Sequence, residues 1–334
     1  MKAIKFFKRY FIIFFFIIYF FLGFSIVDDY GISIDEEFQR YSGFYWLCYV
    51  LEFLPFDQLK SEALTKLHSI EGFTLPNPKD YPFYGVSFDL PLAFIETFFN
   101  INESKNYFIL RHQATFLVFF LSSIFFFKIL KLRLKSKLII FLGILLYISS
   151  PRIFGNSFFN NKDLIFLSLV TISFYYYLKL IINFNYKNII FFSFFSAITS
   201  SLRVLGIFIP ISFLSILVIK NDLKNKKFVF SIIYLSIFIL VLIFFWPYLW
   251  SNPAINFYKA FITFSKYENL TIQMLFNGNY VFSNYLPMSY LPIWILITTP
   301  LISILLFLIG YFYLFKRFFM RLMRIDSVTN RNDL

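Results

Sequence analysis

The sequence predicts an all-α polytopic membrane protein with about eight transmembrane helices, and with interfacial helices in a long first extracytoplasmic loop. Of the 334 residues, 59% are hydrophobic and 54 are Phe, and the mean hydropathy is +0.71. A soluble chain with this much apolar surface would aggregate. The apolar residues also form uninterrupted runs, which are typical of membrane spans. We expect one membrane domain over residues 1–334.

Eight apolar runs account for the predicted spans. The first follows four basic residues and ends at Asp28 and Asp29. Its apolar core is too long for a signal peptide, and no small-residue cleavage site follows it. The predicted spans are residues 6–27, 113–130, 138–150, 164–182, 189–201, 204–219, 228–246 and 291–315.

The distribution of charged residues predicts which side of the membrane each end of these spans faces. An even number of spans places both termini on one side, and that side receives 20 of the 31 Lys and Arg residues but three of the 18 acidic residues. The positive-inside rule makes this side cytoplasmic, so we expect a multi-pass plasma (inner) membrane protein. The net charge of +13 then reports topology, and nucleic acid is not an expected partner.

The long segments between spans lie on the opposite, extracytoplasmic side. They are a first loop at 28–110 and a second at 247–290, whereas residues 316–334 form a basic cytoplasmic tail. Long loops in compact proteins are often functional. Within the first loop, the spacing of apolar residues predicts helices over 34–54 and 86–99, lying along the membrane surface. The run Ser33-Ile-Asp35-Glu36 is typical of a helix N-terminus.

Charged residues near one membrane face need a reason, because charge at that depth is costly unless it is paired or faces water. A single Arg or Lys there is explained by a side chain that reaches the headgroups. Several together, with acids nearby, favour a shared cavity. The candidates are Arg111, Arg152, Lys162, Asp163 and Arg203.

The acidic residues of "DDYGISIDEEFQRYSG" divide into two groups. Asp28 and Asp29 follow the first span and are explained as its outward end. Asp35 and Glu36 begin the predicted surface helix, and Asp35 is equally explained as a helix cap. A carboxylate opposite cations also suits a general base facing a phosphate group, because the base takes a hydroxyl proton while the cations stabilise the leaving anion. Asp163 has its own alternative, a simple pair with Lys162 or Arg152.

Several segments together resemble the GT-C superfamily of lipid-phosphate-sugar glycosyltransferases. The branch is that of the dolichyl-phosphate-mannose–protein mannosyltransferase-like proteins, family 39. "GISIDEEFQRYSG" resembles their catalytic loop, with Asp35 and Glu36 at the acidic pair. "SPRIFGNSFFNNKD" resembles the loop with a second acid, here Asp163. The other matching segments are "YPFYGVSFDLPLAFIE", "RHQATF" and "LPMSYLPIWILITTP".

The resemblance implies an inverting transfer of a sugar from a polyprenyl-phosphate donor to an acceptor hydroxyl on a protein, lipid or glycan. Asp35 would be the base, and Glu36 would orient it or help to hold a metal. Mg²⁺ or Mn²⁺ would suit such ligands, although the need for a metal is left open. The candidate residues for contacts with the donor phosphate are Arg111, Arg152, Lys162 and Arg203. Tyr84, Trp250 and Tyr290 are candidates to contact sugar or acceptor, with an interfacial aromatic belt as the alternative.

Two other functions fit parts of the sequence. A transporter or flippase for a lipid-linked sugar would also have a polar cavity, but it predicts internal repeats and broken helices at mid-membrane. A non-catalytic membrane subunit predicts that changing Asp35 has no effect. The chain is also short for the family, and Asn156 stands where a family member can have His, which bears on acceptor identity and activity.

Overall fold

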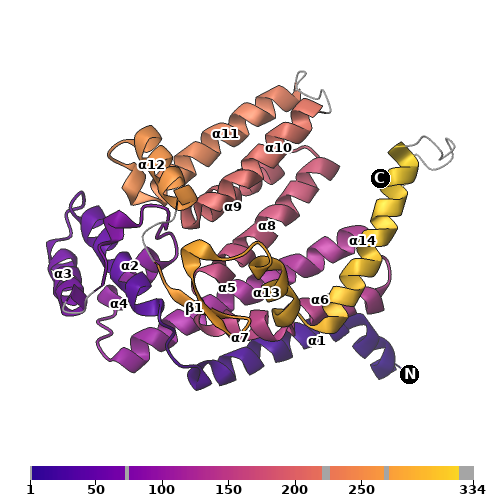
Figure 1. Ribbon diagram of the computed structural model, residues 1–334, viewed down its shortest axis with the longest axis horizontal. Coiled ribbons are helices and arrows are strands. Elements are labelled where there is room, and N and C mark those ends of the chain that lie inside the picture. The colour runs from indigo at the N-terminus through magenta and orange to yellow at the C-terminus, as the bar shows by residue number, and fades with distance from the viewer. Residues whose placement is uncertain (1, 72–74, 220–225, 267–270, 323–334) are drawn as a thin grey trace. The chain divides into compact units, whose positions relative to one another are not determined.

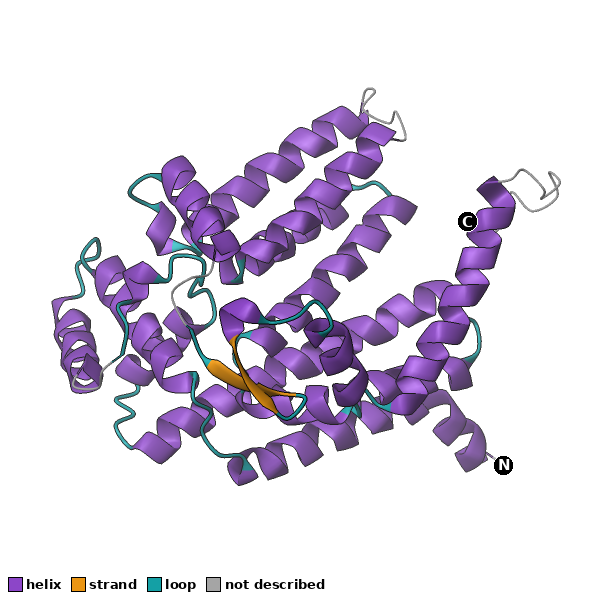
Figure 2. Ribbon diagram, in the orientation of Figure 1, coloured by secondary structure: helices purple, strands orange, loops and turns teal. Residues whose placement is uncertain are grey.

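The computed structural model describes residues 2–71, 75–219, 226–266 and 271–322, and this part of the chain contains 14 α-helices and one two-stranded hairpin (Figures 1 and 2). The predicted all-α class is confirmed. The chain divides into two compact units, Met1–Ile148 with Ile153–Tyr267 and Ser149–Arg152 with Glu268–Leu334, and each is considered by itself.

The first unit holds most of the helices. Its α-helices are α1 (Lys2–Ile26), α2 (Glu36–Leu51), α3 (Asp57–Glu71), α4 (Asp89–Phe98), α5 (Ser104–Arg133), α6 (Lys137–Ile148), α7 (Pro151–Phe159), α8 (Asp163–Ile182), α9 (Tyr186–Leu202), α10 (Phe208–Ile219), α11 (Lys226–Phe244) and α12 (Pro253–Lys266). Single 3₁₀ turns are η1 (Val27–Asp29), η2 (Pro78–Asp80), η3 (Val204–Ile207) and η4 (Pro247–Leu249).

Long apolar helices pack against one another in sequence in this unit. Phe16 and Tyr19 of α1 pack against Phe116 and Phe119 of α5 and against α6, and the opposite face of α1 is exposed and apolar. Gly23 permits close packing there, because the Phe116 ring occupies the space that a Cβ at Gly23 would need. Helix α5 also packs on α8, α8 on α9 and α9 on α11, and α8 to α11 lie side by side in Figure 1.

The first loop folds into a helical lobe. Helix α2 packs against α3 and α4 around a core that includes Phe44, Leu47 and Ala63. The helix predicted over 34–54 is therefore present, but most of its side chains are buried against protein. The helix predicted over 86–99 is α4, and Pro91 lies in its first turn, where a missing N–H costs no intrahelical bond. Helices α3 and α12 have no counterpart among the predicted elements.

Four described helices are long and apolar enough to cross a membrane, in the segments Tyr10–Asp29, Ser104–Arg133, Asp163–Ile182 and Leu301–Met320. A fifth span arises if α6 and α7 count as one, bent by 58°. The bend follows from Pro151, because a proline disfavours helical backbone in the residue before it and fits the first turn of a new helix. Helix α5 is longer than the predicted span 113–130 and includes Arg111 and His112.

The second unit contains β1 (Gln273–Phe276), β2 (Asn279–Phe282), η5 (Ser283–Tyr285), α13 (Tyr290–Thr298) and α14 (Leu301–Leu322). The strands pair antiparallel through Asn277 and Gly278, which both have positive φ, as a tight hairpin turn requires. The predicted span 291–315 is divided, since Thr299 before Pro300 is extended. The predicted basic tail lies outside the described residues from position 323 on.

Candidate active site

Five side chains from four segments gather around Tyr84, and we call them the Tyr84 cluster: Asp35, Tyr84, Lys162, Asp163 and Arg203. The Lys162 ammonium lies 3.7 Å from the centre of the Tyr84 ring, and the Arg203 guanidinium lies 5.7 Å from it. Arg203 donates a hydrogen bond to Asp163 Oδ1. Asp35 lies close enough to Lys162 for its charge to stabilise the ammonium. The predicted gathering of cations and acids at one place is thus present for these residues.

Local backbone structure positions the cluster. Asn160 Oδ1 accepts hydrogen bonds from the backbone N–H groups of Lys162 and Asp163, which fixes the start of α8. Helix α9 ends at Leu202, and extended Arg203 forms an isolated antiparallel bridge with Tyr84. Gly85 makes this approach possible, because a Cβ there would lie 1.5 Å from the carbonyl oxygen of Ser201.

The cluster has a buried side and an open side. Lys162 is buried, Arg203 is partly exposed, and the side chain of Asp163 is 57% exposed. Asp35 is exposed. Burial lowers the pKa of Lys162 to about 8, with Arg203 acting in the same direction, while Asp89, Asp35 and Asp163 raise it. An external anion therefore has access to Arg203 beside a lysine that is still largely protonated at neutral pH.

Asp89, which the sequence did not single out, lies behind Lys162. It is buried and accepts a hydrogen bond of 2.9 Å from Asn161 Nδ2. Burial raises the pKa of Asp89 to about 6, against the effect of Lys162, Arg111 and Asn161, and Glu36 adds to the rise. Asp89 is therefore a nearby buried carboxylate that favours the charged form of Lys162.

A second group of charges is buried, and we call it the buried network: Glu36, Arg40, Glu96, Arg111 and His112. Arg40 binds both carboxylate oxygens of Glu96, at 2.5 and 3.2 Å, and Arg111 Nη2 lies 3.2 Å from Glu96 Oε2. His112 Nε2 lies 2.8 Å from Glu36 Oε2. The network joins α2, α4 and α5 within one unit.

The two members of the predicted acidic pair occupy different environments. Glu36 Oε1 accepts a hydrogen bond of 2.7 Å from the backbone N–H of Ser33, as in a capping box, and Oε2 faces His112. Both oxygens of this buried carboxylate thus have protein partners. Asp35, one residue earlier, is exposed and lies near Lys162.

Of the other predicted site residues, Arg111 and Trp250 have partners outside the cluster, and Arg152 and Tyr290 belong to the second unit. Arg111 is 1% exposed and paired with Glu96 and more distantly with Asp89, so it is enclosed by protein. Arg152 belongs to the second unit, where it donates to Thr298 Oγ1 at 3.1 Å. Trp250 donates to the carbonyl of Ile243, and Tyr290 of the second unit stacks on Trp294. Of the two predicted aromatic contacts in the first unit, Tyr84 belongs to the cluster.

The donor set around the cluster does not fit a carboxylate-bound metal. Asp163 is engaged by Arg203, and Lys162 stands beside Asp35. In the part of the chain that the structure describes, no three His, Cys, Asp or Glu side chains are grouped as metal ligands would be.

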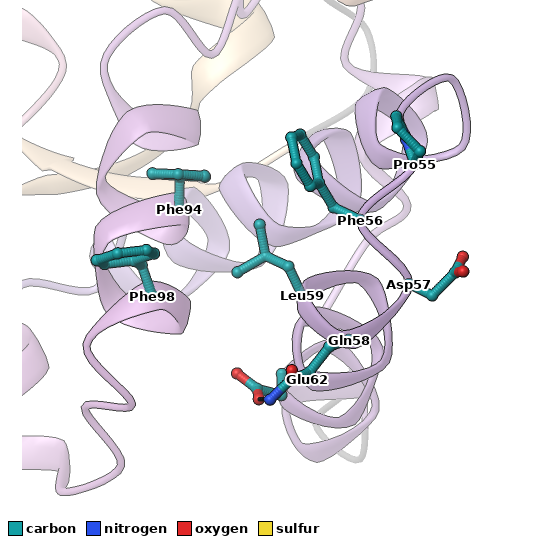
Figure 3. Close-up of a pocket in the computed structure, with 8 residues that line it drawn as sticks. All are labelled: Pro55, Phe56, Asp57, Gln58, Leu59, Glu62, Phe94 and Phe98. Atoms are coloured by element: carbon teal, nitrogen blue, oxygen red, sulfur yellow. Dashed lines mark hydrogen bonds between the residues drawn. The ribbon is translucent and has the colours of Figure 1, made fainter.

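A cavity with a volume of about 690 Å³ lies elsewhere, between α3 and α4. In Figure 3, Phe94 and Phe98 face Phe56 and Leu59 across it, and Asp57 points away. Its polar lining is acidic or neutral, from Asp57, Gln58 and Glu62. This cavity has no residue in common with the Tyr84 cluster.

Comparison of the chain with protein-family models, with curated proteins and with solved structures finds no match.

Proposed function

We propose that the protein is an inverting GT-C-like glycosyltransferase that moves a sugar from a polyprenyl-phosphate donor to an acceptor hydroxyl at the extracytoplasmic membrane face. One observation carries this proposal. The charge of an exposed carboxylate, Asp35, acts on the buried Lys162, and the Tyr84 ring lies between that lysine and the partly exposed Arg203. These residues lie where α2 and α8 begin and where α9 ends. This supplies a base and an anion-binding group at one place.

Each residue has a distinct part in the proposed reaction. Asp35 takes the proton of the acceptor hydroxyl as the oxygen attacks the anomeric carbon. The bond from that carbon to the phosphate oxygen breaks, and the phosphate leaves with the electron pair on the opposite face of the sugar. Lys162 and Arg203 stabilise the negative charge that the phosphate gains. Asp163 orients Arg203, and the Tyr84 ring supports both cations.

The position of the cluster also favours transfer over transport. Lys162 and Asp163 lie at the N-terminal end of α8, and Arg203 lies just past the C-terminal end of α9. A transporter would be expected to hold its substrate near the middle of broken helices. The lipid part of a polyprenyl-phosphate donor would stay in the bilayer while its head reaches the helix ends.

We propose eight spans for the full topology: α1, α5, the bent pair α6 and α7, then α8, α9, α10, α11 and α14. Both termini would be cytoplasmic, as the distribution of Lys and Arg indicates. The first loop and the Tyr84 cluster would then face the extracytoplasmic side of the inner membrane.

Purified protein in lipid vesicles, supplied with a radiolabelled polyprenyl-phosphate sugar, tests the proposal. Asp35→Asn keeps the size of the side chain and removes the base. We expect transfer to acceptor hydroxyls to fall about 100- to 10,000-fold. Glu37→Gln is the matched control, since Glu37 is exposed and next to Glu36 on the same helix turn.

Full transfer by Asp35→Asn would remove Asp35 as the base. No transfer by the unaltered protein would favour a transporter or a non-catalytic subunit instead.

A further inference from the structure

A further cavity lies between the first loop and helix α12, and its volume is about 340 Å³. Its lining comes from both long loops between the predicted spans, since residues 79–82 belong to the first loop and residues 248–263 to the second. Six of the eight lining residues have polar side chains: Lys79, Asp80, Tyr248, Tyr258, Lys259 and Thr263. The volume is within the range of small-molecule sites, and the lining suits a polar ligand.

Two lysines from different segments line this cavity. Lys79 lies in the 3₁₀ turn η2, and Lys259 lies in α12. Both are exposed, and the ion pairs found among the described residues include neither of them. Asp80 is the one acidic residue of the lining, so the lining has a net positive charge. Ammonium groups that hold no carboxylate are available for charge-assisted hydrogen bonds to an external anion.

Two tyrosine rings give the cavity flat apolar surfaces. The carbonyl oxygen of Tyr248 accepts a hydrogen bond of 2.7 Å from Asn256, and the Tyr248 ring lies edge to face with Trp46, so this tyrosine is held in place. Tyr258 is 64% exposed. The C–H face of a sugar ring packs on such aromatic surfaces, while a side chain such as Thr263 offers hydrogen bonds to the sugar hydroxyls.

Along the chain, one buried residue separates this cavity from the Tyr84 cluster. Pro82 lines the cavity, and Tyr84 contacts Lys162. Phe83 between them is 1% exposed and packs against α12. The N–H of Tyr84 donates to the carbonyl of Tyr81 at 3.1 Å, so residues 81–84 form a tight turn. Two residues of chain span about 7 Å at most, and a ligand of a few sugar units is long enough to reach from the cavity to the cluster.

The charges of this cavity distinguish it from the cavity between α3 and α4. The charged lining residues of that cavity are Asp57 and Glu62, which repel an anion. In the cavity beside α12, two lysines outnumber one aspartate. An uncharged peptide would gain nothing from the two ammonium groups, whereas an anionic ligand complements them.

We infer that the cavity beside α12 binds an anionic sugar unit of the acceptor, next to the unit whose hydroxyl is glycosylated at the Tyr84 cluster. The inference rests on the proposed function, which supplies the acceptor, and it makes that acceptor a glycan with carboxylate or phosphate groups. Lys79 and Lys259 bind the anionic group, and Tyr248 and Tyr258 pack against the sugar ring.

Binding of short glycans to the full-length protein in vesicles, measured without any donor, tests the inference. The probes are trigalacturonate, which has carboxylates, and a maltotriose phosphate, with uncharged maltotriose as the reference. We expect at least one charged probe to bind about tenfold or more tightly than maltotriose, and the tighter probe identifies the anion. Lys79→Gln and Lys259→Gln should each weaken binding of that probe about tenfold, because a charge-assisted hydrogen bond is lost.

Lys266→Gln is the matched control, because Lys266 is an exposed lysine of the same helix that does not line the cavity. Equal binding of the three glycans would overturn the inference. So would binding of a charged glycan that is as tight in Lys79→Gln and Lys259→Gln as in Lys266→Gln. These measurements need no sugar transfer, so their failure is distinct from a failure of the proposed function.

The transfer assay gives a second test. We expect Lys259→Gln to raise the KM for an anionic glycan acceptor about tenfold, and the KM for the polyprenyl-phosphate donor by much less. Transfer to a peptide with Ser and Thr hydroxyls, with a KM that Lys79→Gln and Lys259→Gln leave unaltered, would make the acceptor a protein and contradict the inference. Loss of all transfer by the unaltered protein would instead count against the proposed function.

Discussion

The Tyr84 cluster and the buried network contain similar residues, yet only the cluster is open to a ligand. In the network, Glu96 has two arginines as partners and Glu36 has a histidine and a backbone N–H. In the cluster, Asp163 and Asp35 are exposed, and Arg203 is partly exposed. Charges that are completely enclosed hold helices together, whereas charges with an exposed side are available for chemistry.

The adjacent residues Asp35 and Glu36 show how one helix start produces both environments. Successive residues of a helix point about 100° apart, so a turn that directs Glu36 towards α5 directs Asp35 elsewhere. Glu36 accepts a hydrogen bond from the Ser33 N–H, in the turn before α2, and contacts His112. The buried pair fixes the start of α2, and this fixes where Asp35 stands relative to Lys162.

The largest effect on stability is expected from Glu96→Gln, which removes the charge that Arg40 and Arg111 share. Breaking a buried ion pair by removing one partner costs about 3–5 kcal/mol. Unfolding by denaturant in lipid–detergent mixtures measures the loss in free energy of unfolding. Glu103→Gln is the control, since Glu103 is exposed and contacts Asn106, and it should change stability by less than about 0.5 kcal/mol.

A folded Glu96→Gln variant with unchanged stability would mean that the buried network does not hold α2, α4 and α5 together. The buried network would then have no structural role that distinguishes it from the Tyr84 cluster.

A smaller effect is expected from Gly85→Ala. The added methyl group would meet the Ser201 carbonyl, so the segment with Tyr84 must move away from Arg203. Overpacking of this kind costs about 1–3 kcal/mol, and transfer should fall with it. Gly31→Ala provides the comparison in the same loop, because no atom lies within 4 Å of a Cβ there. Equal behaviour of the two variants would show that the Tyr84–Arg203 approach has no consequence.

The smallest predicted effect is a shift in pH dependence. The pKa of Lys162 is about 8, and Asp89 is the charge that raises it most. If charged Lys162 holds the phosphate, the transfer rate should decline as the pH rises through about 8. In Asp89→Asn this decline should begin at lower pH, because the charge that supports the ammonium is gone. Transfer rates measured from pH 6 to pH 9 test this, and Asp57→Asn, at an exposed position of α3, should leave the profile unchanged.

The raised pKa of Asp89 also predicts how the stability of the protein depends on pH. Its pKa in the folded protein is raised from 3.8 to about 6, so the folded state binds more protons than the unfolded state between these values. The contribution to stability is present below about pH 4 and is lost as the pH rises through 6. Denaturant unfolding between pH 4 and pH 7 should show this decline in the unaltered protein and a weaker one in Asp89→Asn. An identical decline in both would assign it to another group.

The sequence predicted the helical fold because long apolar runs leave few alternatives. Bends were harder to predict, although Pro151 and Pro300 carried the signal in both cases. The hairpin was not predicted, although the Asn277-Gly278 pair at its turn is a strong hairpin signal. Composition alone gave no indication that the first loop would build its own packed lobe.

For the candidate site, the position of a residue relative to the predicted spans indicated which residues lie near one another. The sequence did not indicate which of their side chains are buried. Lys162, Asp163 and Arg203 were expected near Asp35, and the structure brings them together. Arg111 was grouped with them, but its partner Glu96 lies in "AFIETFF", where nothing in the pattern distinguishes a buried acid from an exposed one. Asp89 was missed for the same reason, since its partners Asn161 and Lys162 are far away in sequence.

The most direct test of the central claim compares Asp35→Asn with Glu36→Gln in one assay, with the transfer rate divided by the amount of folded protein. The account predicts that Asp35→Asn is as stable as the unaltered protein and nearly inactive. It predicts that Glu36→Gln is destabilised but that its folded molecules retain most of the transfer rate. A stable Glu36→Gln protein without transfer, together with an active Asp35→Asn protein, would contradict the assignment of chemistry to the Tyr84 cluster.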